Sequence, residues 1–440
     1  MSRRAVVLAC AATLLLYLAV ALSFSLRTPA WENNDEQDHA RYAEFIVGHG
    51  ALPPISIANG IESHQPPLYY LTLAAWQKAL AIHAFTPSLS PPSGPPSPTL
   101  GRVNEGSHDY TSEQLKNAES LHGLRLLSIV FGAITVGASF LITLLLTAEL
   151  PLAVAVGATV GVWPKFDVVA AAVSNEAMTD ALVASALLFL AMWLRKARSL
   201  AWSLAVGVAL GAAVLTKFTA LPIAGLMLGV IIILGARRRD WLSPAAALVA
   251  FAAVSGWWFV HNALAYGDPL ADAASRAYLA KAVPGLIWPM PGWSATVLSF
   301  GAKTLVKTVW YDGGWNQLQL PHAVNVAVAV FALACVARFV WSLTWRPPRV
   351  TRWRLIAVIV LPAAGSVIAW LLILRETTQA EGRYLLVAAP AWAFVLCVGA
   401  DVFSRGRAWI RWLGLSLWPA VFLAMSVFVF ARYEIPFGGT

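Results

Sequence analysis

Two short stretches near the N-terminus concentrate the side chains that could do acid–base chemistry. The candidates are Asp35, Glu36, His39 and Tyr42 in the first stretch, and Glu62, His64 and Tyr69 around Pro66-Pro67 in the second. Only 12% of the 440 residues are Asp, Glu, Lys or Arg, so a local group of acids and histidines needs an explanation. Carboxylates and imidazoles can accept and donate protons during a reaction, so their grouping predicts a general acid–base site here.

The first stretch is expected to form a helix that places some of these side chains on one face and the others elsewhere. Asn34 can cap a helix that begins at Asp35. On that helix Asp35, His39 and Tyr42 recur at i, i+4 and i+7 and share one face, which Glu36 does not. Asp35 is therefore the first candidate for a general base, with Glu36 in reserve. Alternatively, both acids serve only to start the helix and complement its dipole.

The second stretch leads into another expected helix, over residues 64–82, which suits an interfacial or re-entrant position better than a membrane span. Glu62 and His64 could bind a substrate, assist the base, hold a divalent ion or simply pack the loop. The acids and histidines of both stretches lack the tight spacing of a metal site, so we predict no metal or other cofactor.

Composition identifies the setting of this loop as a membrane. The chain is 59% hydrophobic, and its mean hydropathy is +0.67. Apolar runs of about 20 residues have the length of transmembrane helices. The net charge of +9 does not indicate nucleic acid, because the basic residues lie between the apolar runs. About eleven spans are expected, and their approximate ranges are 5–25, 121–147, 152–172, 177–194, 200–215, 219–235, 243–260, 322–342, 355–374, 384–401 and 412–431.

The distribution of basic residues predicts the orientation of these spans. About half of the 31 lysines and arginines fall in short connections on one side, which the positive-inside rule makes cytoplasmic. The N-terminus is then cytoplasmic and the C-terminus lies outside, as do the long loops 26–120 and 261–321. Residues 1–25 could instead be a cleaved signal segment, with Ala19-Val20-Ala21 as a cleavage site.

Several charged residues lie at the predicted outer ends of spans, away from the cytoplasmic basic clusters. Lys217 and Arg383 could stabilise negative charge on a substrate, with His261 as a weaker candidate; snorkelling to lipid headgroups is the alternative. Asn175 and Glu176 lie at another outer edge. Asp180 falls inside the fourth span, where an acid is costly, so it is either a second site acid or the partner of a buried cation such as Lys165.

Motifs spread over most of the chain resemble those of the GT-C superfamily of membrane glycosyltransferases, in its protein mannosyltransferase-like and aminoarabinose transferase-like branch. The matching strings are Asp35-Glu36, Arg41-Tyr42-Ala43-Glu44, His64-Gln65-Pro66-Pro67-Leu68-Tyr69-Tyr70, Ser174-Asn175-Glu176, Leu215-Thr216-Lys217, Tyr266-Gly267-Asp268-Pro269 and Gly382-Arg383-Tyr384. The chain departs from that pattern before Pro66-Pro67, where the aminoarabinose branch has lysine and this chain has Gln65.

The resemblance implies an all-α polytopic membrane protein, with residues 1–440 as one GT-C-like domain whose outer loops carry interfacial helices. It also implies an enzyme of the cell (inner) membrane that transfers a sugar from a polyprenyl-phosphate donor, inverts its configuration and acts at the outer face. An acidic residue of the first outer loop would act near the acceptor hydroxyl. The substrate-binding candidates are His39, Tyr42, Glu62, His64, Tyr69, Asn175, Glu176, Lys217, His261, Arg383 and Tyr384.

Two other functions stay open at this point. A transporter or flippase for a lipid-linked or anionic substrate would also use intramembrane Asp180 and Lys217, although the sequence lacks the repeated halves typical of transporters. A non-catalytic subunit with the same fold is the second alternative. The expected partners are the lipid bilayer, a polyprenyl-phosphate sugar and a glycan, lipid or protein acceptor, and no nucleic acid.

Overall fold

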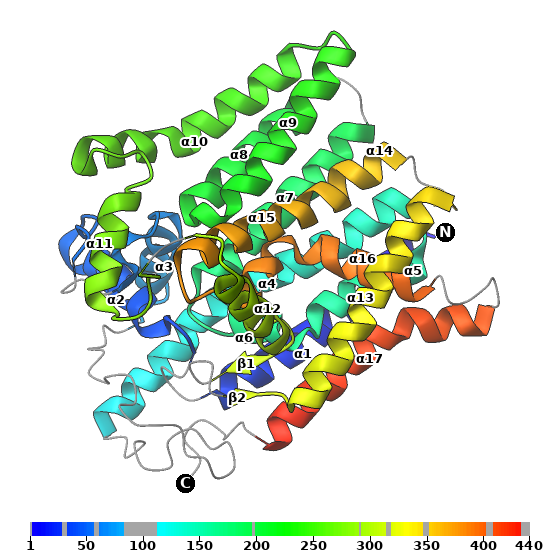
Figure 1. Cartoon of the computed structure of the whole chain (residues 1–440), viewed down its shortest axis with the longest axis horizontal. Helices are drawn as coiled ribbons and strands as arrows, with labels where there is room; N and C mark the ends of the chain where they lie inside the picture. The colour runs from blue at the N-terminus through cyan, green and yellow to red at the C-terminus, as the bar shows by residue number, and fades with distance from the viewer. Residues whose placement is uncertain are drawn as a thin grey trace.

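The structure is a computed structural model, and nearly all of its regular elements are helices (Figure 1). It describes residues 2–28, 33–56, 61–82, 112–195, 199–289, 292–313, 318–345, 352–401 and 408–432. Much of the predicted outer loop 26–120, including its proline-rich part, lies outside these residues.

Nine helical segments in the described ranges are long and apolar enough to cross a membrane. Three of them reach this length only together with the short helical turns that precede them, which are η3 (Phe218–Ala220), α14 (Arg352–Leu355) with η4 (Ile356–Val360), and η5 (Gly382–Ala388). The main helices are α1 (Arg3–Arg27), α4 (Ser112–Thr147), α7 (Asn175–Arg195), α9 (Leu221–Arg237), α10 (Leu242–Tyr266), α13 (His322–Trp345), α15 (Leu361–Glu376), α16 (Ala389–Asp401) and α17 (Ala408–Arg432).

The two remaining apolar segments of the sequence are also helical but differ from a straight span. Helices α5 (Leu150–Gly161) and α6 (Pro164–Ala170) form a pair bent by 61°. The bend follows from Pro164, which lacks a backbone donor and pushes Trp163 out of the helical region, to ψ 111°. Helix α8 (Leu200–Thr216) has only 17 residues. The all-helical membrane architecture is thus confirmed, while the count of eleven spans stays a prediction.

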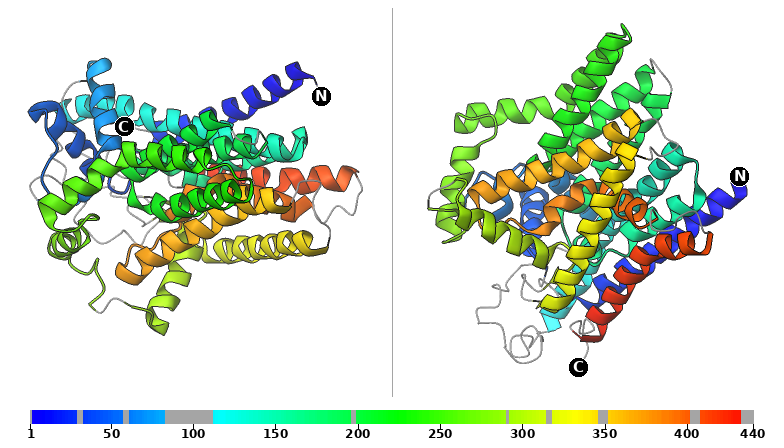
Figure 2. Two further views of the ribbon diagram at one scale, coloured as in Figure 1. Left: turned by 90° about the horizontal axis from the view of Figure 1, so that it is seen from above. Right: turned by 45° about the vertical axis from the view of Figure 1, so that its right-hand side comes forward.

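The helices expected outside the membrane gather at one end of the bundle. They are α2 (Glu36–His49), the turn η2 (Ile61–His64), α3 (Leu68–Ala79) and α11 (Asp272–Ala282), and they lie away from the N-terminus in two views (Figures 1 and 2). Helix α12 (Ala295–Thr308) and a hairpin of β1 (Asp312–Gly313) and β2 (Leu318–Gln319) follow them in the chain. The orientation of this end relative to the membrane stays a prediction.

Two local expectations about the first outer helices were wrong. Helix α2 begins at Glu36 rather than Asp35; Asp35 precedes it in the left-handed region at φ 63°, and no side-chain cap is formed. The second helix is shorter than 64–82, because the residues before Pro66-Pro67 form the separate turn η2. Helices α2 and α3 pack with α4 around a small apolar core that contains Tyr42, Tyr70 and Leu73.

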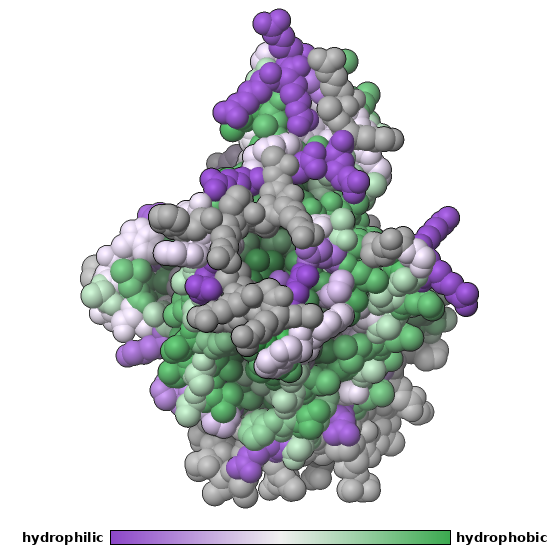
Figure 3. Space-filling model, turned by 90° about the vertical axis from the view of Figure 1, so that its right-hand side faces the viewer, coloured by the Kyte–Doolittle hydropathy of each residue, from purple (hydrophilic) through white to green (hydrophobic). Residues whose placement is uncertain are grey.

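The surface and the helix contacts both suit a lipid environment. Large apolar side chains such as Leu8, Val249 and Leu264 are exposed. Figure 3 shows apolar side chains over much of one face, with the largest group of hydrophilic ones toward its top and others scattered over the rest. Helices α8 and α10 approach closely at Gly207 and Gly211, where a Cβ atom would meet backbone of α10. Such small-residue contacts are common between membrane helices. The chain is therefore an integral membrane protein.

Candidate active site

Four helical segments bring a buried group of charges together at the end of the bundle that carries α2 and α3. The group, named here the charged cluster, contains Asp35 before α2, Glu176 in the first turn of α7, Lys217 at the end of α8, and Glu381 and Arg383 at the start of η5. Two cations thus share three acids in a site that is largely shielded from solvent, where charge interactions are stronger than in water.

Arg383 is the centre of the charged cluster. Its Nη2 atom lies 3.0 Å from Asp35 Oδ2, and its Nε atom lies 2.9 Å from Glu381 Oε2 and 3.5 Å from Glu176 Oε1. Gly382 makes this position possible: its backbone N–H donates to Thr308 Oγ1 at 2.7 Å, and a Cβ atom there would collide with the Val309 backbone. The close contact between η5 and α12 therefore fixes the backbone position from which the Arg383 side chain extends.

Lys217 completes the cationic side of the site. Its Nζ atom donates to Glu176 Oε1 at 2.7 Å and to Asn175 Oδ1 at 3.3 Å. The ring of Tyr384 lies 5.4 Å from both Lys217 Nζ and Arg383 Cζ, which adds a cation–π contact to each. Among the acids of these ion pairs, the Asp35 side chain is the most accessible, at 17%, against 8% for Glu176 and 3% for Glu381. Asp35 is thus the carboxylate best placed to meet a substrate.

A neutral hydrogen-bond network backs the charged cluster and centres on the Tyr70 hydroxyl. His39 Nδ1 lies 3.0 Å from this hydroxyl, Asn175 Nδ2 donates to it at 3.3 Å, and it donates to Glu62 Oε2 at 3.3 Å. Burial lowers the pKa of His39 to about 3. Burial, and secondly the Asp35 carboxylate, raise the pKa of Glu62 to about 8. At neutral pH the network therefore carries little charge, and it holds Asn175 against Lys217.

The remaining aromatic candidates pack behind this network. Tyr42 stacks on Tyr70 with a centroid separation of 3.8 Å and an interplanar angle of 10°. The Tyr69 hydroxyl lies 3.3 Å from Ser128 Oγ. His64 Nδ1 lies 2.7 Å from the Ile61 carbonyl, and burial lowers its pKa. These side chains position the Tyr70 network rather than line the open part of the site.

Glu36 lies apart from the charged cluster. Arg125 donates to both of its carboxylate oxygens at 2.8 Å, and the Val173 backbone N–H donates to Oε1 at 3.0 Å. Both side chains are completely buried, and Arg125 also donates to the carbonyls of Ser25 and Thr28. Glu36 thus ties α1, α2, α4 and the start of α7 together, and the reserve role as base has no geometric support.

Two other expectations from the sequence do not fit the structure. His261 lies on an exposed part of α10, and its ring stacks on Trp258 with a centroid separation of 4.9 Å; within the described residues no ion pair joins it to the charged cluster. Lys165 pairs with Asp312 of β1, so the proposed Lys165–Asp180 pair is wrong. Asp180 is buried one turn after Glu176, and its Oδ2 atom has no hydrogen-bond partner among the described residues.

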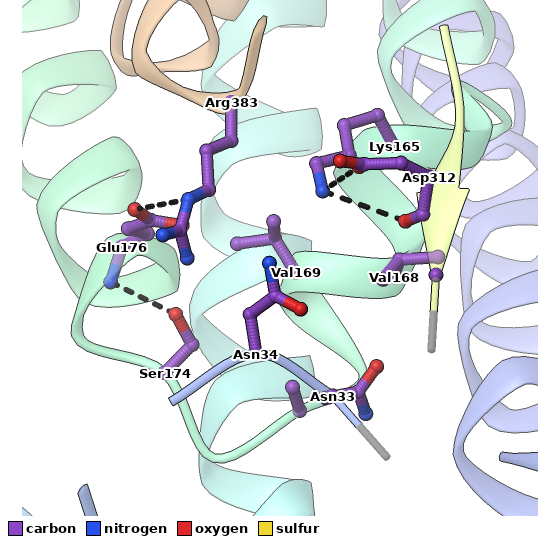
Figure 4. A pocket seen from close by; sticks show the side chains of 11 residues that line it. Asn33, Asn34, Lys165, Val168, Val169, Ser174, Glu176, Asp312 and Arg383 are labelled. Atoms are coloured by element: carbon purple, nitrogen blue, oxygen red, sulfur yellow. Dashed lines mark hydrogen bonds and ion pairs between the residues drawn. The ribbon is translucent and has the colours of Figure 1, made fainter. Parts of the chain in front are cut away.

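A pocket opens beside the charged cluster (Figure 4). It is lined by Asn33, Asn34, Lys165, Val168, Val169, Ala172, Ser174, Glu176, Asp312, Gly313 and Arg383. The sequence pattern did not identify Lys165, Asp312, Glu381 or Tyr70 as site residues. A signal did exist for Lys165, a charged residue within an apolar segment, which is rare unless it is paired or functional.

Within the described ranges, no group of three or more His, Cys, Asp or Glu side chains is arranged to hold a metal ion. The expectation that the protein uses no cofactor therefore stays a prediction. The site offers acids, cations and hydroxyls for acid–base and anion-binding chemistry.

Comparison of the sequence with known protein families and with curated proteins found no match. Comparison of the fold with solved structures found several matches. ArnT from Cupriavidus metallidurans, bound to undecaprenyl phosphate, matches with a TM-score of 0.55 and 14% identity over 98% of this chain. The archaeal oligosaccharyltransferase AglB from Archaeoglobus fulgidus, in complex with an inhibitory peptide and a dolichol-phosphate, matches with a TM-score of 0.52 and 13% identity over 97% of this chain.

The chain has the GT-C fold. At 13–14% identity these matches show the fold alone, and that fold is the one implied by the motif resemblance. The match covers 65% of the ArnT chain and 56% of the AglB chain, so this chain spans about two thirds or less of the proteins it resembles.

Proposed function

We propose that the protein is an inverting glycosyltransferase that moves a sugar from a polyprenyl-phosphate donor to an acceptor hydroxyl at the outer face of the membrane. The observation that carries this proposal is the contact between Asp35 and Arg383, a partly accessible acid held against a buried cation in a membrane protein. The solved structures with a similar fold hold undecaprenyl phosphate in ArnT and a dolichol-phosphate in AglB, which supports a polyprenyl-phosphate donor here.

The charged cluster suits a single displacement at the anomeric carbon. The acceptor oxygen forms a bond to that carbon while the bond from the carbon to the phosphate oxygen breaks, and the leaving phosphate keeps the electron pair. Asp35 takes the proton of the acceptor hydroxyl. Arg383 and Lys217 stabilise the negative charge that develops on the leaving phosphate. One displacement inverts the configuration of the sugar.

Donor binding also accounts for the ion pair between Asp35 and Arg383. Arg383 forms ion pairs with all three acids of the charged cluster. A phosphate that binds Arg383 competes with Asp35, which is the most exposed of these acids, and releases its carboxylate toward the acceptor. Glu176 and Glu381 stay bound to the cations and keep them in place. Donor binding therefore prepares the base.

The test uses purified protein in lipid nanodiscs and a panel of polyprenyl-phosphate pentoses and hexoses. Asp35→Asn is expected to lose about 100- to 10,000-fold in turnover, the usual contribution of a positioned general base, and to keep binding bare polyprenyl phosphate. Asp272→Asn is the matched control, because Asp272 lies on exposed α11 and its carboxylate pairs with Arg276 of the same helix.

Full turnover by Asp35→Asn would remove Asp35 as the base. If the wild-type protein neither binds nor turns over any member of the panel, the glycosyltransferase proposal fails, and the transporter and subunit alternatives gain support.

A further inference from the structure

The pocket beside the charged cluster lies between two ion pairs. Figure 4 places Arg383 and Glu176 on one side and Lys165 and Asp312 on the other, with Asn34 and Val169 between them. The first pair belongs to the cluster to which we assigned the phosphate. The second pair joins α6 to the β1–β2 hairpin and has no part in the displacement described above.

We infer that this pocket holds the sugar ring of the donor and that it takes a neutral sugar rich in hydroxyl groups. The inference rests on the proposed function and adds to it the class of sugar and three residues of its subsite, Asn33, Lys165 and Asp312.

The charge of the pocket favours a neutral ligand. Its ionisable lining residues are Lys165, Glu176, Asp312 and Arg383, two cations and two acids. All four side chains are nearly inaccessible to solvent, so their charges are poorly screened. A charged ligand would be attracted by two of these residues and repelled by the other two. A neutral ring avoids this repulsion.

The free hydrogen-bonding atoms of the pocket point to hydroxyl groups in particular. In the part of the chain that the structure describes, Asn33 Nδ2 is a buried donor without a partner, while Glu176 Oε2 and Asp312 Oδ2 are buried acceptors without a hydrogen bond. Leaving such groups unpaired is costly. A hydroxyl both donates and accepts, so a sugar can satisfy all three. A phosphate oxygen only accepts and would be repelled by the two carboxylates.

The rest of the lining fits the non-polar face of a sugar. Val168, Val169 and Ala172 come from α6 and the residues after it, and they supply an apolar wall. This wall is small, and most of the other lining residues are polar or charged, which suits a ring with many hydroxyl groups. The pocket also adjoins the reacting groups, since Asn34 precedes Asp35 in the chain and Arg383 lines it directly. A ring bound there has its phosphate at Arg383 and its anomeric carbon toward Asp35.

The experiment compares the affinity for a polyprenyl-phosphate sugar with that for bare polyprenyl phosphate of the same chain length. The panel contains neutral pentoses and hexoses and one amino sugar. Wild-type protein is expected to bind at least one neutral sugar donor more tightly than the bare lipid. Asn33→Ala is expected to reduce this preference on the order of 3- to 10-fold, the value of one hydrogen bond, with the affinity for the bare lipid unchanged.

Asn33→Ala removes no hydrogen bond of its Nδ2 atom to the described protein, so it tests the pocket with little risk to the fold. Asp312→Asn is the second variant and should also reduce the preference. Ser416→Ala, on the exposed side of α17, is the control and should leave both affinities unchanged.

Three results would overturn the inference while the proposed function stands. They are a wild-type preference only for the amino sugar, no preference for any sugar over the bare lipid, and an unchanged preference in both Asn33→Ala and Asp312→Asn. A wild-type protein that binds neither lipid would instead overturn the proposed function itself, and the inference with it.

Discussion

Asp35 and Glu36 are neighbours with the same chemistry, yet the structure predicts opposite consequences when each is neutralised. Glu36→Gln is expected to destabilise the protein, whereas Asp35→Asn is expected to fold normally and lose turnover. The Glu36 carboxylate is fully buried and accepts three hydrogen bonds, two from Arg125 and one from the Val173 backbone. Asp35 has a 17% exposed side chain and one recorded ion pair, with Arg383.

The magnitudes follow from these partners. Breaking a buried ion pair by removing one charge costs about 3–5 kcal/mol, because the remaining charge is left uncompensated. Glutamine also turns an amide N–H group toward the guanidinium of Arg125, where two donors face each other. Neutralising Asp35 should cost less, because Asp35 is partly accessible and Arg383 keeps Glu176 and Glu381 as partners. The Tm of Glu36→Gln should therefore fall by several degrees more than that of Asp35→Asn.

The assay is thermal unfolding in detergent, followed by the fluorescence of the 20 tryptophans, together with turnover on the donor panel. Arg125→Met combined with Glu36→Gln should cost less than the sum of the single variants, because the double variant leaves no unpaired charge. The assignment would be refuted by a Glu36→Gln protein with wild-type Tm and no turnover, since that result would make Glu36 the functional acid.

Further outcomes are expected from the pH response, the helix packing and the topology. Burial raises the pKa of Glu62 to about 8, so the folded protein holds a proton that the unfolded carboxylate has lost, and stability should fall between pH 6.5 and 8. His39 adds little in this range, because its imidazole is mostly neutral in both the folded and the unfolded chain. Glu62→Gln should flatten this fall when Tm is measured against pH. Gly207→Ala should lower Tm, at a cost of about 1–3 kcal/mol, because its Cβ would collide with the carbonyl of Ala247, whereas Gly256→Ala on α10, with open space, should not. A cysteine introduced as Lys281→Cys, in the second predicted outer loop, should react with an impermeant thiol reagent added outside the cell; reaction only from the cytoplasmic side would reverse the topology.

The membrane architecture could be predicted from the sequence because its signal is local. A run of apolar residues long enough to cross the bilayer must be helical, since lipid offers no partner for backbone groups. All of the predicted apolar segments are helical in the structure, including the segment at 152–172 that Pro164 bends. The bend itself depends on one residue type, and the sequence contained that information, although the prediction treated the segment as one straight span.

The site was only partly predictable. Glu176, Lys217 and Arg383 carried a usable signal, because charged residues at the ends of apolar segments need partners. Helical phase also separated Asp35 from Glu36, although the reason given for it was wrong: Asp35 lies before the helix, in a left-handed conformation, rather than on its face. Tyr70 carried no distinguishing signal, because its role depends on three partners from different elements.

The sequence by itself determined that the chain enters a membrane, where its helices lie and which few residues are charged there, since each of these follows from residue type and local periodicity. Only the tertiary structure decided which charges are paired. Arg125 is 89 positions from Glu36, and Arg383 is 348 positions from Asp35. The order of residues does not show which distant side chains share one desolvated space. That sharing separates Glu36, which is fully buried against Arg125, from Asp35, which is partly accessible and pairs with Arg383.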